Sequence, residues 1–365
     1  MAGVYIHIPI CHSKCAYCDF YSQPSAVLAD DICSAIAAEY KLRCDESDDR
    51  LVRTLYVGGG TPSVLSPRQL ACAIEPVPRD NIEEFTIEVN PEDVTVDKAR
   101  CWIELGVNRI SMGVQSFNDE ELSYVGRRHS ASGALEAFDS LRKAGFDNIS
   151  LDFIYGLPLQ DLESWNDTLR QLMQCRPEHF SAYALSYEPG TRLSARVASG
   201  KLSPTDDETV AYMYEMLCEY AMRYGYRHYE ISNFAKPGFH SHHNSSYWNS
   251  TPYLGLGPAA HSFDGLQRRY NPSDTRRWLA AVKSGRSAAV IDPESESERI
   301  GDIIFTRLRT DEGLPLSLIP ESYRNSLLET ASAMPQGHVE LIDNVLRIPQ
   351  RHWLISDAII RELLP

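Results

Sequence analysis

Six short apolar segments, each followed by a helix-like stretch, constrain the fold of this chain more than any other feature. They are Val4–Ile10, Arg53–Val57, Phe85–Val89, Arg109–Gly113, Ile149–Tyr155 and Phe180–Leu185. The segments read as continuous apolar runs rather than as strict alternation, which is typical of parallel strands buried on both faces. Strand and helix units alternating in this number predict an α/β fold in which a parallel sheet curls into a partial (β/α)6 barrel.

The second part of the chain has a different pattern. Residues 232–264 are dense in His, Asn, Gly and aromatic residues and are predicted to be rich in loops. From about Trp278 onward the chain reads as mostly helical, and its tail predicts two short strands over 338–348 followed by a helix over 355–364. We therefore expect the partial barrel to occupy residues 1–235. A small, mainly helical, winged-helix-like C-terminal domain is expected over residues 236–365.

Polar or glycine-rich residues stand where each predicted strand ends. In order along the chain these are the cysteine loop after the first strand, Gly58–Pro62, Glu88–Pro91, Gln115–Ser116, Asp152 and Ser186. The active site of a (β/α) barrel lies at the carboxyl ends of its strands. Six strand ends of this kind would be unusual in a barrel that is purely structural. The sequence therefore predicts a functional site at that rim.

Three cysteines lie close together directly after the first predicted strand. Cys11, Cys15 and Cys18 have the spacing CxxxCxxC within VYIHIPICHSKCAYCDFYS. A cluster of four irons takes one ligand for each iron, so three thiolates would leave one iron open to a substrate or cofactor. The alternatives are a zinc site with its fourth ligand elsewhere, or three unrelated buried cysteines. The tight spacing favours a [4Fe-4S] cluster.

The loop and its flanks, YIHIPIC and CDF, resemble the signature of the radical S-adenosylmethionine (SAM) family, and in particular its coproporphyrinogen-oxidase-like branch. This resemblance implies that SAM chelates the open iron through its amino and carboxylate groups. Reduction then cleaves SAM to methionine and a 5′-deoxyadenosyl radical. It also implies a coproporphyrinogen-oxidase-like character for residues 236–365.

The same resemblance implies a set of SAM contacts. They are Tyr5, Gly60, Thr61, Glu88, Gln115, Arg127 and Asp152. A guanidinium suits pairing with the SAM carboxylate, and Arg128 is the adjacent alternative to Arg127. Each position also has a structural interpretation, such as a tight turn for the glycines, a solvated rim charge for Glu88 or a core aromatic for Tyr5. A carboxylate inside an apolar run, as at Asp152, is costly unless it is paired or liganded.

A second motif, His243-Asn244-Ser245-Ser246-Tyr247-Trp248, follows two more histidines, His240 and His242. Histidines this close could form a metal-ligand set or a solvated loop. The motif resembles the HNxxYW sequence of the HemW-type heme chaperones, which implies that His243 is a heme ligand. A neutral imidazole is a common axial ligand of heme iron, and aromatic rings can flank a porphyrin face.

Two interpretations compete within this branch. The oxygen-independent coproporphyrinogen III oxidases carry a fourth cysteine, CxxxCxxCxC, and an N-terminal extension before it, whereas this chain has Phe20 at that position and a first strand that starts at Val4. Both differences favour a heme chaperone, and whether the protein is an enzyme stays open. The expected cofactors are a [4Fe-4S] cluster, SAM and heme. The partners are heme and an acceptor protein of unknown identity, and peripheral contact with membrane-bound acceptors and a homodimer are compatible with this interpretation.

Composition excludes several other classes. The net charge of −15 argues against general nucleic-acid binding, including by the winged-helix-like tail, since phosphate contacts need surplus Lys and Arg. The sequence contains no apolar run of about 18 residues, so no membrane-spanning helix is expected. The start MAGVYIHIPIC lacks a basic region and a cleavage site, so no signal peptide is expected. Nine cysteines in a chain of this length are not a disulfide framework, and they favour the reducing cytoplasm.

Overall fold

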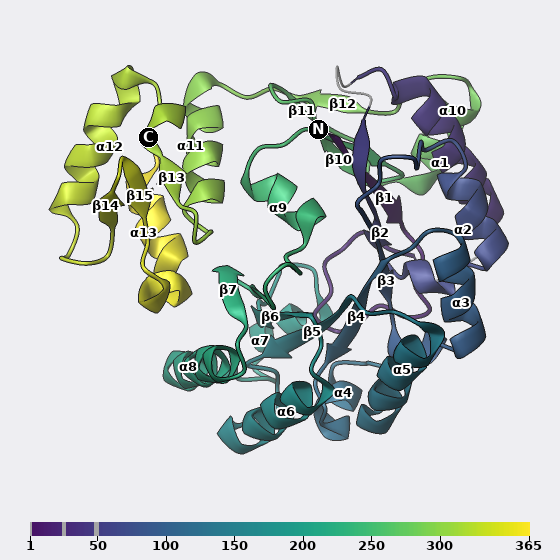
Figure 1. The fold of residues 1–365 in the computed structure, drawn as a ribbon, viewed down its shortest axis with the longest axis horizontal. Coiled ribbons are helices and arrows are strands. Elements are labelled where there is room, and N and C mark those ends of the chain that lie inside the picture. The colour runs from purple at the N-terminus through teal and green to yellow at the C-terminus, as the bar shows by residue number, and fades with distance from the viewer. Residues whose placement is uncertain (1, 24–26, 47–50) are drawn as a thin grey trace.

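The computed structural model describes residues 2–23, 27–46 and 51–365, which form one large curved sheet with helices around it (Figure 1). Six parallel strands in chain order make up the middle of this sheet. They are β1 (Ala2–Ile8), β2 (Val52–Gly59), β3 (Glu84–Val89), β4 (Arg109–Gln115), β5 (Ile149–Tyr155) and β6 (His179–Ala184). Each overlaps one of the six predicted segments, so the predicted partial barrel is confirmed.

Helices cover the convex side of these strands (Figure 1). They are α1 (Ala29–Arg43), α2 (Pro67–Ile74), α3 (Val96–Glu104), α4 (Asp119–Tyr124), α5 (Ala131–Ala144), α6 (Leu162–Cys175) and α8 (Asp207–Arg223). The short helix α7 (Arg192–Ala198), between β6 and α8, lies at the cysteine loop instead, where the N–H of Leu193 donates to the carbonyl of Ala16. Local sequence sets their ends. At α2, for example, the Ser66 hydroxyl accepts a hydrogen bond from the backbone N–H of Gln69, whose side chain bonds back to Ser66, and Pro67 fills the first helical position.

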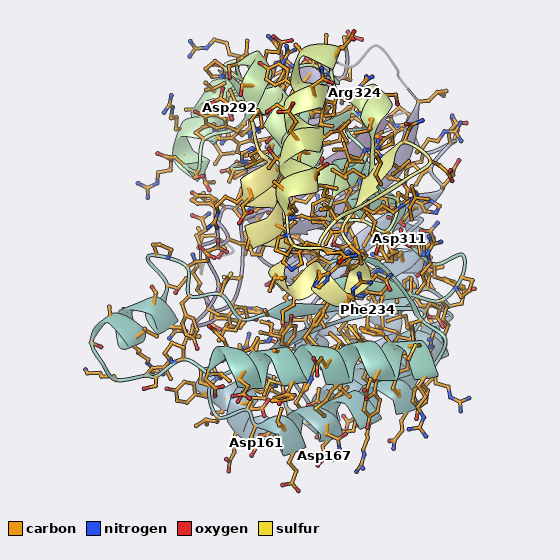
Figure 2. The ribbon with its side chains drawn as sticks, turned by 90° about the vertical axis from the view of Figure 1, so that its left-hand side faces the viewer. Asp161, Asp167, Phe234, Asp292, Asp311 and Arg324 are labelled. Carbon is orange, nitrogen blue, oxygen red and sulfur yellow. The ribbon has the colours of Figure 1, made fainter. Side chains whose placement is uncertain are left out.

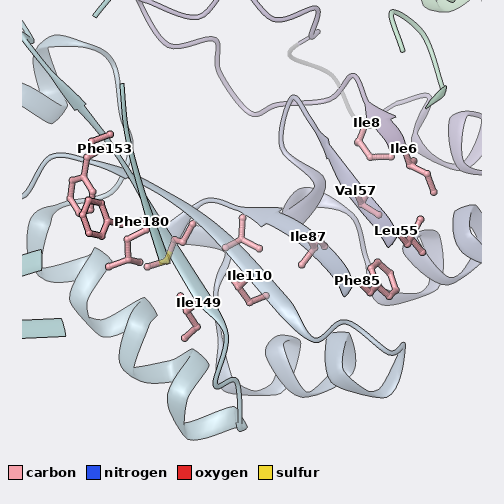
Figure 3. Packing of buried hydrophobic residues seen from close by; sticks show 14 of the residues in the cluster. Ile6, Ile8, Leu55, Val57, Phe85, Ile87, Ile110, Ile149, Phe153 and Phe180 are labelled. Carbon is pink, nitrogen blue, oxygen red and sulfur yellow. The ribbon is translucent and has the colours of Figure 1, made fainter. Parts of the chain in front are cut away.

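The two faces of the six central strands have different chemistry. Every second residue is apolar and packs under the helices, as for Ile6, Val57 and Phe153 (Figure 3). The residues between them are mostly polar or aromatic and face the concave interior, where strand register aligns Tyr5 with Tyr56 and Thr86 with Arg109. The expectation of continuous apolar runs was therefore wrong for the inner face. Both faces are largely buried, but the inner one is built for binding rather than for packing.

Strands that the sequence did not reveal extend both edges of the sheet. Beyond β1 lie β9 (Tyr253–Leu256), β10 (His261–Phe263), β11 (Arg268–Tyr270) and β12 (Val290–Asp292), and beyond β6 lie β8 (Asn233–Ala235) and β7 (Arg227–Glu230). Residues 232–264, predicted to be rich in loops, contain β8, β9 and β10 and also α9 (His242–Trp248). The sequence did not reveal these elements because strands of three or four residues and a helix of seven are too short to show a period. The boundary at residue 235 stays a prediction, and the sheet itself continues past it.

The last part of the chain lies to one side of the barrel, the side that faces the viewer in Figure 2. It consists of α11 (Glu296–Arg307), α12 (Glu321–Ala333), α13 (Ser356–Leu363) and a small antiparallel sheet of β13 (Leu314–Pro315), β14 (Glu340–Ile342) and β15 (Val345–Arg347). Helix α10 (Thr275–Lys283) instead packs against α1 on the opposite side (Figure 1). Short 3-10 turns occur at Pro62–Val64, Pro91–Asp93, Leu316–Leu318 and Gln350–Ile355. The mainly helical character predicted for this region is confirmed. An ion pair of 2.6 Å between Arg227 and Asp311 joins it to β7.

Candidate functional site

A cavity of about 490 Å³ opens at the carboxyl ends of the central strands. This volume is within the range of small-molecule sites. It brings together most of the residues that the sequence singled out, namely Cys11, Cys15, Cys18, Gly60, Thr61, Glu88, Gln115, Arg127 and Asp152. Tyr5 and His243 do not line it. The predicted convergence at the strand ends therefore exists as one cavity.

The cysteine loop is held in place by backbone hydrogen bonds to neighbouring segments. The N–H of Cys11 donates to the carbonyl of Gln23 at 3.2 Å, and the N–H of Ala16 donates to the carbonyl of Val125 at 2.8 Å. Cys11 is buried, Cys15 and Cys18 are half-buried, and all three are free thiols. The loop thus presents three cysteines to the cavity from a fixed backbone.

The three thiols come from one loop and line the same cavity. Each thiolate of a four-iron cluster binds a different iron, so three of them would hold three irons. The guanidinium of Arg127 donates from Nη1 to the Cys15 sulfur at 3.7 Å, so a cation stands next to the thiol that would carry negative charge.

The glycine-rich turn after β2 packs directly against the cysteine loop. A Cβ on Gly60 would lie 2.6 Å from the carbonyl oxygen of Ile10, and Gly59 has a φ of +110°. Both positions therefore require glycine. The N–H of Gly60 donates to the carbonyl of Ile8 at 2.8 Å, which fixes the turn beside the first strand. Backbone atoms at this wall can approach a ligand closely.

Two carboxylates face the cavity from β3 and β5, and hydrogen bonds hold both. Glu88 accepts from the Tyr56 hydroxyl at 2.9 Å and from the N–H of Gly59 at 3.1 Å. Asp152 accepts from the hydroxyls of Ser111 at 2.7 Å and Ser150 at 3.1 Å. Burial raises the pKa of both groups, that of Glu88 from 4.5 to about 7. The cavity therefore holds carboxylates that gain from a cationic or hydrogen-bonding ligand.

The raised pKa of Glu88 predicts a pH dependence of stability. Between about pH 4.5 and pH 7 the folded protein keeps a proton on Glu88 that the unfolded chain releases, so the free energy of unfolding falls as pH rises through this window. From pH 5 to pH 8, wild type should lose about 1–3 kcal/mol more than Glu88→Gln. Urea unfolding of both proteins measures this difference. Glu230, whose pKa burial also raises to about 7, remains in both and cancels. Equal losses in the two proteins would refute the assignment.

Arg127 and Gln115 form the wall of the cavity that faces the cysteine loop. The Arg127 guanidinium donates to the Asn90 side-chain oxygen at 2.8 Å and to the carbonyl of Gly113 at 2.5 Å. Arg128 does not line this cavity, so the structure favours Arg127 of the two neighbouring arginines. Gln115 has a φ of +68°, a left-handed conformation that is rare outside glycine and clusters at functional sites.

His243 lies beneath the cavity, near the amino ends of β1 and β2. Its side chain is completely buried, with Nδ1 2.8 Å from the Thr54 hydroxyl and Nε2 2.9 Å from the Tyr247 hydroxyl. Burial lowers its pKa to about 4, so the ring is neutral. Tyr5 is close by and bonds Nδ1 of His7 at 3.0 Å. Both ring nitrogens of His243 are engaged, so binding a heme iron would require one of these hydrogen bonds to break.

Helix α9, which carries the HNSSYW motif, lies within the concave side of the sheet (Figure 1). Glu84 of β3 accepts hydrogen bonds from the backbone N–H groups of His242 at 2.8 Å and His243 at 3.0 Å, which stabilises the start of the helix. Asn244 of this helix lines the cavity. The motif is therefore adjacent to the cysteine-lined site through one side chain.

Several lining residues were not predicted from the sequence, among them Arg109, Tyr56, Ser111 and Tyr183. The strand residues of this group are on the inner face of the sheet. A polar residue at every second position of each apolar segment was the signal that could have found them.

The parallel barrel and its cysteine loop define a protein of the radical SAM class, and residues 5–172 match the model of the Radical SAM superfamily. The heme chaperone HemW of Bacillus subtilis is 34% identical over 338 residues, covering 90% of this chain and 88% of that protein. HemW of Mycobacterium tuberculosis (strain H37Rv) is 32% identical over 374 residues, covering 99% and 94%. The chain belongs to the same family as these HemW proteins.

Two further similarities extend over the whole chain. The mitochondrial radical S-adenosyl methionine domain-containing protein 1 of Mus musculus is 37% identical over 389 residues, covering 100% of this chain and 87% of that protein. The solved structure of coproporphyrinogen III oxidase (HemN) from Escherichia coli superposes with a TM-score of 0.83 at 22% identity, covering 100% of this chain and 90% of that one. At that identity the structural likeness establishes the fold.

Proposed function

We propose that this protein is a heme chaperone that binds a [4Fe-4S] cluster, SAM and heme and passes heme to an acceptor protein. The observation that carries the proposal is the similarity, over about nine-tenths of the chain or more, to relatives named heme chaperones. The cavity supports it, because it has the donors that a cluster and SAM require.

In this proposal Cys11, Cys15 and Cys18 hold the cluster. When bound, the cluster would supply an open iron for SAM to chelate and an electron for its cleavage. The chain's own residues bind and orient SAM. The backbone at Gly60 and Thr61 approaches its amino end, and the guanidinium of Arg127 faces its carboxylate. The further SAM contacts are proposed to be Glu88, Gln115 and Asp152, whereas Tyr5, the remaining contact that the family resemblance implies, does not line the cavity.

Phe20 supports a chaperone over an oxidase. It occupies the position at which the coproporphyrinogen oxidases have a fourth cysteine, and it lines the cavity with 64% of its surface exposed. An exposed aromatic ring beside the cysteine loop can stack on a flat apolar ligand such as a porphyrin. A thiol at this position could not provide that surface.

We propose His243 as the heme ligand, reached after its bond to Thr54 or Tyr247 opens. Heme titration followed by absorption should then show at least tenfold weaker binding for His243→Ala. The exposed neighbour His242 supplies the matched control, and His242→Ala should bind heme as wild type does. A His243→Ala protein that is folded and binds heme with unchanged affinity would remove the ligand role, and loss in His242→Ala alone would transfer it to that residue.

The proposed partners are heme and an acceptor protein, and the cytoplasm is the proposed location. Among the described residues no helix is long and apolar enough to span a membrane. The net charge of −15 supports the absence of a nucleic-acid partner. A homodimer and peripheral contact with a membrane-bound acceptor belong to the same proposal.

A further inference from the structure

A buried arginine without hydrogen-bond acceptors lies at the deep end of the cavity. Arg109 begins β4, lines the cavity and is 1% exposed. In the described part of the chain, its Nε and Nη1 atoms have no hydrogen-bond partner. The charges of Glu88 and Asp152 compensate part of the charge of Arg109, but buried N–H groups without acceptors are costly and are normally satisfied by a bound molecule. The guanidinium is therefore positioned to receive an acceptor that the chain does not supply.

A second unpartnered group lies beside it. Thr86 of β3 is aligned with Arg109 in the strand register and lies on the same inner face. Its hydroxyl is also buried and has no partner among the described residues. Two neighbouring strands thus present three buried polar atoms to the same side, all able to donate hydrogen bonds. Arg109 lines the cavity and Thr86 lies directly behind the lining, so the arrangement points to a binding site centred on Arg109.

The nearby carboxylates do not satisfy these donors. Glu88 is bonded by Tyr56 and Gly59, and Asp152 is bonded by Ser111 and Ser150. A molecule that enters the cavity, a ligand or a water, can therefore supply the acceptor for Arg109.

Depth separates this site from the arginine at the rim. Arg127 contacts Cys15, at the mouth of the cavity. Arg109 precedes Ser111 by two residues along β4, which places it roughly 6–7 Å farther from the carboxyl end of the strand. The cavity therefore has one guanidinium at each end, and the deeper one suits a second anionic group.

We propose that Arg109, assisted by Thr86, binds a carboxylate of the molecule that fills the cavity. Guanidinium is the side chain best suited to carboxylate recognition, and its preference is strongest where water is excluded. This inference rests on the proposed function for its two candidate ligands. Heme carries carboxylates on its propionate side chains, and SAM carries one on its methionine portion.

Three ligands and four variants test the proposal in the full-length, cluster-reconstituted protein. Affinities for SAM, heme and heme dimethyl ester, which lacks free carboxylates, are measured by titration for wild type, Arg109→Met and Thr86→Val. Arg109→Met should weaken binding of one carboxylate ligand about tenfold or more, and Thr86→Val should weaken it less. Arg170→Met, on the exposed face of α6, serves as the control. Arg109→Lys keeps the charge but loses the planar donor fork, so it should weaken binding of the same ligand less than Arg109→Met does.

The ligand that responds identifies the source of the carboxylate. If heme binding weakens while dimethyl ester binding is unchanged, Arg109 binds a propionate. If SAM binding weakens instead, Arg109 binds the methionine carboxylate in place of Arg127, to which the proposed function assigns it. Unchanged affinity for both ligands in folded Arg109→Met would overturn the proposal and leave Arg109 as a counter-ion of Glu88 and Asp152.

Failure to fold does not remove the test. If Arg109→Met is unfolded by circular dichroism, Thr86→Val and Arg109→Lys decide, and wild-type affinity for SAM and heme in both overturns the proposal. If wild type itself binds no heme, the proposed chaperone function fails, whereas the SAM titrations still test Arg109.

Discussion

Replacing Cys15 with serine is expected to abolish the iron–sulfur cluster. Cys15 is the central cysteine of the loop, lines the cavity and receives a hydrogen bond from Arg127. With two thiolates left, two irons would lack protein ligands, and such a cluster is not retained. Iron and acid-labile sulfide, measured after anaerobic reconstitution and gel filtration, should fall from about four of each per chain to near zero. The absorption of the cluster should be lost with them.

Cys101 provides the matched control for this substitution. It is a half-buried free cysteine on α3, away from the cavity, so Cys101→Ser should retain the full cluster. A Cys15→Ser protein with iron and sulfide at the wild-type level would show that the ligand assignment is wrong. Equal loss in Cys101→Ser would show that the assay reports general damage instead.

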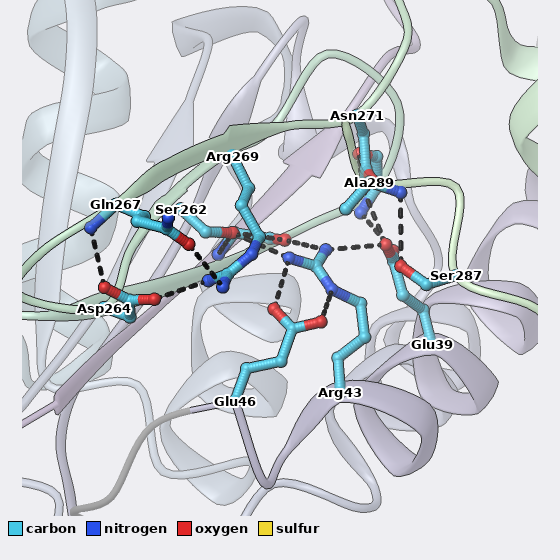
Figure 4. Close-up of polar contacts among 12 residues, drawn as sticks. Glu39, Arg43, Glu46, Ser262, Asp264, Gln267, Arg269, Asn271, Ser287 and Ala289 are labelled. Carbon is cyan, nitrogen blue, oxygen red and sulfur yellow. Dashed lines mark hydrogen bonds and ion pairs between the residues drawn. The ribbon is translucent and has the colours of Figure 1, made fainter. Parts of the chain in front are cut away.

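Replacing Arg43 with methionine is expected to cause the largest loss of stability. Its guanidinium is 1% exposed and pairs with Glu39 at 3.0 Å and Glu46 at 2.9 Å (Figure 4). It also donates to the carbonyl of Gly255 and the hydroxyl of Ser262, both at 3.0 Å, and so ties α1 to β9 and β10. Removing one partner leaves buried charge uncompensated, which costs about 3–5 kcal/mol. Chemical denaturation measures this as a shift of the unfolding midpoint.

An exposed ion pair between the same helix and the end of α2 serves as the control. Nζ of Lys41 lies 3.4 Å from Oε2 of Glu75, and about two-thirds of each side chain is exposed. Lys41→Met should therefore change the free energy of unfolding by less than about 0.5 kcal/mol. A loss below about 1 kcal/mol in Arg43→Met would contradict this prediction. It would mean that the hydrogen bonds of Arg43 to Gly255 and Ser262 contribute little to the attachment of β9 and β10, and that the pairing of β9 with β1 is sufficient.

The sequence predicted the parts of the fold and site that depend on local order. The parallel strands appear as apolar segments, and the cysteine loop follows one of them directly, so both could be located without coordinates. A parallel arrangement brings all strand ends to one rim, which is why Gly60, Glu88 and Asp152 could be expected together.

Features that depend on long-range pairing could not be read in this way. β9 adds to the edge of β1 across some 250 residues, and its four residues carry no periodic signal. Burial of His243 follows from α9 entering the barrel, which the motif does not encode. The sequence predicts only that Arg109 begins a strand. Its position beside Thr86, deep in the cavity, depends on the register between β3 and β4, which the sequence does not show.

The most direct test of the central claim is an anaerobic incubation of the cluster-reconstituted protein with SAM, a reductant and coproporphyrinogen III. Products are separated by chromatography and identified by mass. A heme chaperone should yield no decarboxylated porphyrinogen, while the same preparation, with its cluster verified, binds heme. Protoporphyrinogen that accumulates in proportion to 5′-deoxyadenosine would contradict the proposal and make this protein an oxidase.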